Sequence, residues 1–252
     1  MLVSYMDCDA RAAARILVAS KRDVEHEIER HYQLGFWRRL VLHARGIWQP
    51  MTSPVVLWPR DFIMECLPFS FVPGNSSPER VENIDPEVVL SNLYSEKYPV
   101  RSVEEEHKLL DWLDSMADCP DDWLRRTCAP QYSQVGNLPL YAAFEGKNRV
   151  VLYRRLGRSI RARVDGTGYP APSDLKVRRT FPFGHYVLIC SDKRFADHRG
   201  KRVRKKVLPF PQAVLPLLRA YGVRIKRRRA RFMPFSPLRL IAARLLLTRA
   251  QG

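Results

Sequence analysis

The sequence lacks the patterns that mark a disulfide-bonded or zinc-binding protein. Its 252 residues include five cysteines, an odd number that are widely spaced, and no C-x-x-C pair. A disulfide framework needs cysteines that can pair, and a zinc knuckle needs ligands at short spacing. We therefore expect ordinary buried or half-buried thiols and no metal site.

Long apolar runs are also missing. No stretch of about 18 apolar residues is present that could cross a bilayer. The N-terminus carries charged residues such as Asp7 and Arg11 where a secretory signal would have an unbroken apolar segment. The sequence predicts a cytoplasmic protein without a membrane partner.

The signatures of several enzyme classes are absent as well. There is no Gly-x-Ser-x-Gly elbow, Walker A run, Rossmann fingerprint or EF-hand. The six histidines are dispersed along the chain, which gives no support to Ser-His-Asp or Cys-His catalysis. Asp192 and Asp197, near His185 and His198, are the one thin candidate for a metal cluster, and a surface loop explains them as well.

Acidic residues are scarce in one part of the chain. Residues 1–143 hold 15 Lys+Arg and 21 Asp+Glu, whereas residues 144–252 hold 28 and 5. The formal net charge of +17 thus combines a part of −6 with a part of +23. A surplus of this kind predicts an acidic partner for the second part, and nucleic acid is the commonest one.

The densest cationic runs are the candidate nucleic-acid contacts. They are flanked by aromatic residues, such as Phe210 and Tyr221, that either anchor the runs in a core or stack on bases. The candidate residues are Arg199, Lys201, Arg202, Arg204, Lys205, Lys206, Arg224, Lys226, Arg227, Arg228, Arg229 and Arg231.

Hydrophobic periodicity and capping residues indicate a mixture of helices and strands. The prolines of 47–86 predict a loop-rich linker instead of a packed unit, and Pro216 is expected to kink or divide its helix. The predicted helices are 8–46, with Gly35 between two of them, 102–116 with Ser102 as its cap, 121–127, 150–156, 211–220 and 236–248, and the predicted strands are 138–145, 160–164 and 185–190.

A glycine turn joins the first of these strands to a basic helix. The turn reads Glu145-Gly146-Lys147-Asn148-Arg149. Glycine lets the backbone approach a phosphate, the N–H groups of a helix N-terminus point toward it, and Lys147 and Arg149 supply positive charge. The turn is therefore a candidate phosphate site. The alternative is that Gly146 only makes the turn and that Arg149 pairs with Glu145 or an N-terminal acid.

This region resembles the N-terminal domain of the ParB/sulfiredoxin superfamily over about residues 84–166. The similarity rests on two groups of elements. The first is an upstream strand, a proline-arginine loop and the acid-capped helix after it, and the second is the acid-Gly-x-x-Arg turn with the helix and strand after it. The matching segments are 86–94, Pro99-Val100-Arg101, the acid-capped helix 102–116, the turn 145–149, Leu156-Gly157 and the strand Ile160-Arg161-Ala162-Arg163-Val164.

The resemblance implies an α+β fold with a ParB/sulfiredoxin-like mixed sheet. It also implies that the turn holds the phosphates of a nucleotide, possible cofactors being a nucleoside triphosphate and Mg²⁺. Sulfiredoxins need a cysteine in this turn, so Lys147 and Asn148 disfavour sulfinic-acid reduction. The residues implied in nucleotide binding are Glu145, Gly146, Lys147, Asn148 and Arg149, together with Arg101 from the upstream loop.

We therefore expect a ParB-like DNA-binding protein with four segments. The alternatives are a ParB-like nuclease or NTP hydrolase, and an RNA-binding or nucleoprotein assembly protein. The acidic N-terminal part either packs against the rest or recruits a protein partner. The segments are a helical N-terminal segment (1–46), a proline-rich linker (47–83), a ParB-like domain (84–170) and a basic C-terminal extension (171–252).

Overall fold

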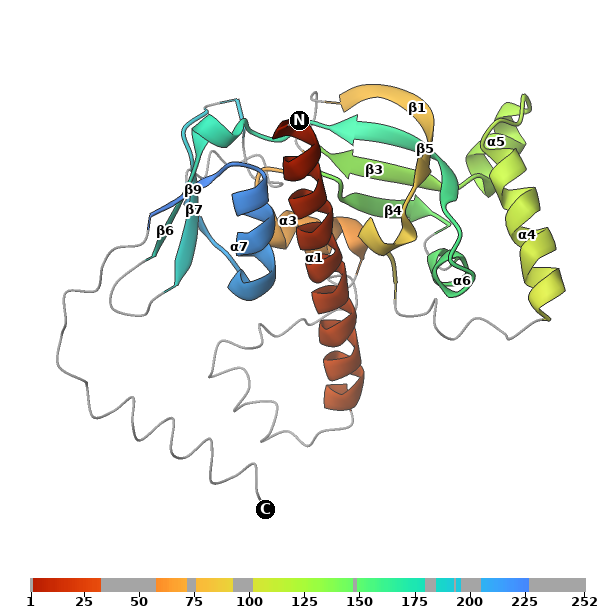
Figure 1. Cartoon of the computed structure of the whole chain (residues 1–252), viewed down its shortest axis with the longest axis horizontal. Coiled ribbons are helices and arrows are strands. Elements are labelled where there is room, and N and C mark those ends of the chain that lie inside the picture. The colour runs from red at the N-terminus through yellow and green to blue at the C-terminus, as the bar shows by residue number, and fades with distance from the viewer. Residues whose placement is uncertain are drawn as a thin grey trace, which may run out of the picture.

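Two mixed β-sheets and six α-helices make up the part of the chain that the computed structural model describes (Figure 1). The expected α+β class is confirmed. None of the helices in this part is long and apolar enough to span a membrane. The described residues are 2–32, 58–71, 76–92, 102–146, 149–179, 185–192, 194–195 and 205–226.

The larger sheet has five strands in the order β1-β5-β3-β4-β2. β2 runs parallel to β4, and β3 runs parallel to β5, while the other two pairs are antiparallel. The carboxyl ends of β2 and β4 therefore leave the sheet at the same edge. The strands are β1 (Ser76–Ile84), β2 (Val89–Leu90), β3 (Gln131–Val135), β4 (Tyr141–Glu145) and β5 (Ile160–Thr167).

The smaller sheet has four strands in the order β8-β7-β6-β9. β6 is parallel to β9 and antiparallel to β7, which is antiparallel to β8. The predicted strand at 185–190 is confirmed as β7. The strands are β6 (Leu175–Arg179), β7 (Tyr186–Cys190), β8 (Lys205–Val207) and β9 (Arg224–Lys226).

Most helices form where local sequence signals place them. Ser102 and Glu105 make a reciprocal capping box at the start of α4 (Val103–Met116), and the Asp121 carboxylate accepts N–H bonds at the start of α5 (Asp122–Cys128). Such caps satisfy backbone donors that a helix leaves unbonded. α6 (Val150–Arg155) is followed by Gly157 in the left-handed region, also as predicted.

Two predictions about helices need correction, and two others concern residues outside the described part of the chain. α1 (Leu2–Tyr32) starts earlier than expected, and Pro216 lies inside α7 (Pro211–Ala220) without dividing it. Residues 33–46, with Gly35, and residues 236–248 lie outside the described part of the chain.

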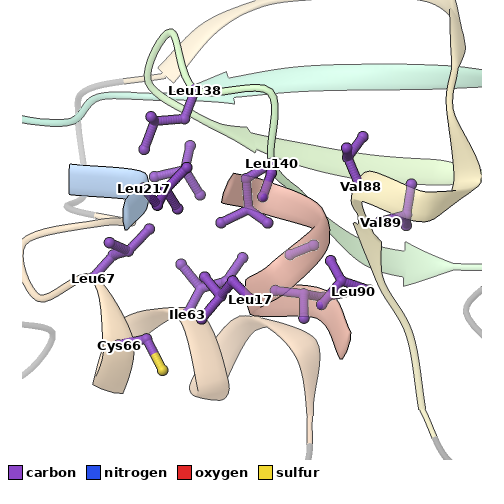
Figure 2. Close-up of a cluster of buried hydrophobic side chains, with 14 of the residues drawn as sticks. Leu17, Ile63, Cys66, Leu67, Val88, Val89, Leu90, Leu138, Leu140 and Leu217 are labelled. Atoms are coloured by element: carbon purple, nitrogen blue, oxygen red, sulfur yellow. The ribbon is translucent and has the colours of Figure 1, made fainter. Parts of the chain in front are cut away.

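One hydrophobic core joins both sheets to the helices. Leu17 of α1, Leu90 of β2, Leu140 just before β4 and Leu217 of α7 are buried in the same cluster (Figure 2). Figure 1 shows α1 and α7 side by side between the two sheets, and these helices are in contact. Segments from the two ends of the described sequence are therefore held together by apolar burial.

The prediction of an unpacked linker over 47–83 is wrong for the part of it that the structure describes. Pro59 is the first residue of α3 (Pro59–Cys66), a position that suits proline because the first helical N–H has no partner within the helix. Ile63 and Cys66 of this helix are fully buried members of the core cluster (Figure 2). Proline here starts a helix whose apolar residues have helical spacing.

The burial of α3 generates the first prediction. Ile63 has no exposed surface, whereas Ile16 on α1 is 47% exposed. Ile63→Ala should lower the free energy of unfolding by about 2–5 kcal/mol, because a buried cavity is left behind. Ile16→Ala, the matched control, should change it by less than about 0.5 kcal/mol. Urea denaturation measures both, and equal small changes would show that α3 does not belong to the core.

Candidate functional site

The glycine turn lies where β4 ends and α6 begins. Gly146 has a φ of +74°, and an added Cβ would sit 3.4 Å from the Cα of Pro130. The Gly146 N–H donates to Glu145 Oε1 at 3.0 Å, and the Arg149 N–H donates to the Gly146 carbonyl at 2.9 Å. Glycine is thus favoured at position 146 for two reasons: its backbone is left-handed, and Pro130, which directly precedes the neighbouring strand β3, lies close to it.

Arg149 connects the turn to the end of α5. Its Nη1 donates to the carbonyl oxygen of Cys128 at 3.2 Å, and the side chain is half-buried. This bond is not the pairing with Glu145 or an N-terminal acid that was the structural alternative. A carbonyl carries no formal charge, so this hydrogen bond orients the guanidinium and leaves its positive charge at the turn.

The described structure brings together three of the six residues expected at the phosphate site. These are Glu145, Gly146 and Arg149, while Lys147, Asn148 and Arg101 lie outside the described residues. β2, which precedes Arg101 in the sequence, runs parallel to β4 and pairs Leu90 with Ala142. Ligands of open α/β sheets bind at the carboxyl ends of strands.

Two buried cations, which the sequence analysis did not identify, hold this edge of the sheet in place. Arg154 of α6 donates from Nε to the Pro86 carbonyl at 3.0 Å and from Nη2 to the Val89 carbonyl at 2.6 Å. Lys21 of α1 donates to the Ser91 carbonyl at 2.7 Å and pairs with Glu25. Burial lowers the pKa of Lys21, and the Glu25 carboxylate acts in the opposite direction.

Arginines that follow the turn pair with acids of α4 and of the residue stretch just after it. Each pair joins the basic part of the sequence to the acidic part. Glu106 is almost fully buried beside Arg155, and breaking a buried pair leaves an uncompensated charge. The pairs are Arg155 with Glu106, Arg158 with Asp111 and Asp114, and Arg161 with Asp118.

Further pairs extend this neutralisation to the two sheets. Arg163 on β5 pairs with Glu79 on β1, and Lys206 on β8 pairs with Glu65 on α3 at 3.4 Å. Part of the positive charge of residues 144–252 is therefore balanced inside the molecule. The charge asymmetry of the sequence overstates what remains for a partner.

The candidate nucleic-acid residues that the structure describes lie on the smaller sheet. Lys205 on β8 and Arg224 on β9 are exposed, and Lys226 is the last residue of β9. Lys176 and Arg178 on β6 were not predicted as contacts, although the alternation Leu175-Lys176-Val177-Arg178 is a visible strand signal. Outside the described residues lie Arg199, Lys201, Arg202, Arg204, Arg227, Arg228, Arg229 and Arg231.

The described structure contains only part of the thin metal-site candidate. Asp192 pairs with Arg194 at 2.7 Å, and this hydrogen bond lowers the pKa of the Asp192 carboxyl. Asp197 and His198 lie outside the described residues. Among the residues that are described, no group of three His, Cys, Asp or Glu side chains is placed to hold a metal ion.

Comparison with protein-family models, with curated proteins and with solved structures found no match to this chain.

The Arg161–Asp118 pair generates a prediction about titration. Arg161 Nε donates to Asp118 Oδ2 at 2.5 Å, and this bond lowers the pKa of Asp118. A lowered carboxyl pKa in the folded state stabilises the fold above the unfolded value of about 3.9, and this stabilisation is lost as the pH falls through the folded pKa. Arg161→Gln should return the pKa of Asp118 toward its ordinary value.

Carboxyl NMR titration measures this change. Arg126→Gln is the matched control, because Arg126 pairs with Asp122 and should leave the titration of Asp118 unaltered. Global stability should change little, since both partners of the Arg161–Asp118 pair are largely exposed. An unchanged Asp118 titration in Arg161→Gln would contradict the assignment.

Proposed function

We propose that this protein binds nucleic acid, DNA in the first instance, through the basic surface of its smaller sheet. The observation that carries the proposal is the placement of charge. Residues 171–226 contain 14 Lys+Arg and three Asp, and the strands that this segment forms put Lys176, Arg178, Lys205 and Arg224 on one sheet. Phosphate contacts of this kind supply most of the sequence-independent affinity for DNA.

Solubility alone does not account for this surface. A net charge of magnitude about 2–8 is sufficient to keep a small domain in solution, and 14 cations against three acids in one segment exceed it. A larger surplus destabilises a compact state through self-repulsion. The acids near the glycine turn relieve that repulsion for the arginines around them, and an anionic partner would do so for the smaller sheet.

Salt dependence tests the nucleic-acid proposal. Binding to a labelled DNA duplex, measured by fluorescence anisotropy, should weaken by at least about a thousandfold between 50 and 200 mM salt if about six phosphates are contacted. The double variant Lys205→Gln with Arg224→Gln should reduce the slope of log affinity against log salt by about 1.8, which is 0.9 for each contact.

The matched control is Lys108→Gln with Arg126→Gln, which removes the same charge from α4 and α5, where both cations pair with acids. It should keep the wild-type slope. Binding that does not vary with salt would contradict the proposal. Plasmid DNA incubated with the protein and Mg²⁺ or Mn²⁺ should stay intact, and cleavage would favour a nuclease instead.

We also propose that residues 84–166 form a ParB/sulfiredoxin-like unit whose glycine turn binds the phosphates of a nucleoside triphosphate. The order of elements after residue 84 supports this: a short parallel strand, an acid-capped helix, a second helix and strand, a strand ending in the turn, and a helix leading to a last strand. A phosphate at the turn is favoured because Arg149, hydrogen-bonded to the neutral Cys128 carbonyl, keeps its positive charge there. Mg²⁺ would arrive with the triphosphate, and Glu145 is the carboxylate at the turn.

The present hydrogen bonding of the turn shows what a phosphate would have to replace. The Gly146 N–H already donates to an anionic oxygen, that of the exposed Glu145 side chain. A phosphate oxygen could take its place at small energetic cost, because the Glu145 carboxylate can turn into water. This replacement is chemically conservative, one anionic acceptor for another.

Nucleotide titration tests the turn separately from the basic sheet. Fluorescent nucleoside triphosphate should bind the wild-type chain, and Lys147→Ala with Arg149→Ala should weaken this binding by at least about tenfold, because two phosphate contacts are lost. Arg149→Lys keeps the positive charge, although it disturbs the hydrogen bond to the Cys128 carbonyl. This variant should therefore retain part of the affinity for the nucleotide. Arg126→Gln on α5 serves as the control for charge loss nearby. Unaltered binding in the double variant would remove the site assignment.

A further inference from the structure

The smaller sheet has one face in the core and one face outside it. Side chains alternate between the two faces of a strand, and the strand register shows which residues share a face. Leu188, Val177 and Ile225 lie in one row across β7, β6 and β9. They pack into the same apolar cluster as Leu217 of α7, so this face is the inner one.

The opposite face carries cations and aliphatic side chains in separate positions. Lys205, Ile189, Lys176 and Arg224 form one row across the four strands. Val207, Val187 and Arg178 continue the face in the next row. The cations of β6 and β9 thus lie beside one another, and the aliphatic residues belong to β7 and β8.

Lys176 and Arg224 are a like-charged pair directly opposite each other on parallel strands. Adjacent strands are about 4.8 Å apart, and like charges placed directly opposite destabilise a sheet. Charged residues often protect edge strands from pairing with other chains, which explains Arg224 on the edge strand β9. Edge protection does not explain Lys176 and Arg178, because β6 has strands on both sides.

The surface of the larger sheet makes a useful contrast. Its outer arginines have acids beside them: Arg163 pairs with Glu79, and Arg80 pairs with Glu82 on the same strand. The four strands of the smaller sheet contain no Asp or Glu, although Lys206 pairs with Glu65 of α3. The exposed Arg178 and Arg224 share the outer face of this sheet and favour an external anion as its ligand.

The aliphatic positions indicate what kind of nucleic acid fits. Val207 is 54% exposed, and Val187 and Ile189 are half-buried, so this part of the face offers apolar surface to a partner. A duplex presents phosphates along its outside and keeps its base faces stacked inside. A single strand presents phosphates and apolar base faces together, so a site for it needs cations beside side chains that can contact the base faces.

We propose that the outer face of the smaller sheet binds single-stranded nucleic acid, with the phosphates along β6 and β9 and the bases over β7 and β8. This inference rests on the proposed nucleic-acid binding and adds the strandedness of the ligand and the orientation of its backbone. It assigns different roles to two groups of residues. Lys176, Arg178 and Arg224, together with Lys205 at the end of the first row, contact phosphates, and Val187, Ile189 and Val207 contact bases.

The experiment compares oligo(dT), oligo(U) and a DNA duplex of equal length at the same salt concentration. The full chain should bind a single strand about tenfold more tightly than the duplex, a difference of about 1.4 kcal/mol. The triple variant Val187→Thr, Ile189→Thr and Val207→Thr keeps β-branched side chains and adds hydroxyls. It should lose about tenfold in single-strand affinity and leave duplex affinity unaltered.

Two further variants complete the design. Ile16→Thr, Val81→Thr and Val103→Thr, at exposed positions outside this sheet, form the matched control and should bind as the wild type. Lys176→Gln with Arg178→Gln should reduce the salt slope for a single strand by about 1.4, which is 0.7 for each contact. This second readout applies even if the threonine variant folds poorly.

The outcomes separate the inference from the proposed function. Tighter binding to the duplex, or single-strand binding that neither the threonine nor the glutamine variant alters, overturns the inference and leaves nucleic-acid binding in place. Absence of binding to all three ligands overturns both. Tighter binding to oligo(dT) or to oligo(U) than to the duplex supports the inference.

Discussion

The structure depends on ion pairs that join its acidic sequence to its basic sequence. Arg155, Arg158 and Arg161 follow one another along α6 and β5, and each meets an acid on α4 or just after it. Glu106 depends most strongly on its counterion Arg155, because its carboxylate is buried and a buried charge without a counterion is strongly destabilising. These pairs fix α4 against the element that follows the glycine turn. The position of the turn therefore depends on residues that lie about 40 positions earlier in the chain.

The same pairs change the meaning of the charge asymmetry. A count over the sequence assigns all 28 cations of residues 144–252 to one surplus. In the folded chain, the cations up to Arg163 are largely matched by acids from the first part, while those of β6 and β9 share a sheet face with one another. Among the described residues, the basic surplus of this part of the sequence thus lies mainly on the smaller sheet. Local surplus, and not the total, determines where an anion binds, since screening limits each charge to about 8–10 Å.

Sequence reasoning succeeded where structure is set locally and failed where it is set by distant contacts. The helix starts at Ser102 and Asp121 were predictable because a capping side chain bonds to backbone only two or three residues away. The proline-rich segment was mistaken for a linker because its helix is stabilised by a core that residues far away complete. At the turn, the sequence identified Gly146 and Arg149. It could not show that Pro130 and Cys128 are their neighbours, because α5 and β3 come there only through the fold.

The two proposed sites belong to one packed body, and this has a mechanical consequence. α1 contacts both β2, at the edge where the turn lies, and α7, which packs under the smaller sheet. Lys21 fastens α1 to the end of β2 through the Ser91 carbonyl, and Leu17 one turn earlier lies in the apolar core (Figure 2). Protein interiors are close-packed and transmit displacement instead of absorbing it. A shift of the β2 edge on binding a phosphate would therefore have to be accommodated by α1 and α7 together. α1 and α7 thus form a continuous packed path between the edge of the larger sheet where the turn lies and the smaller sheet.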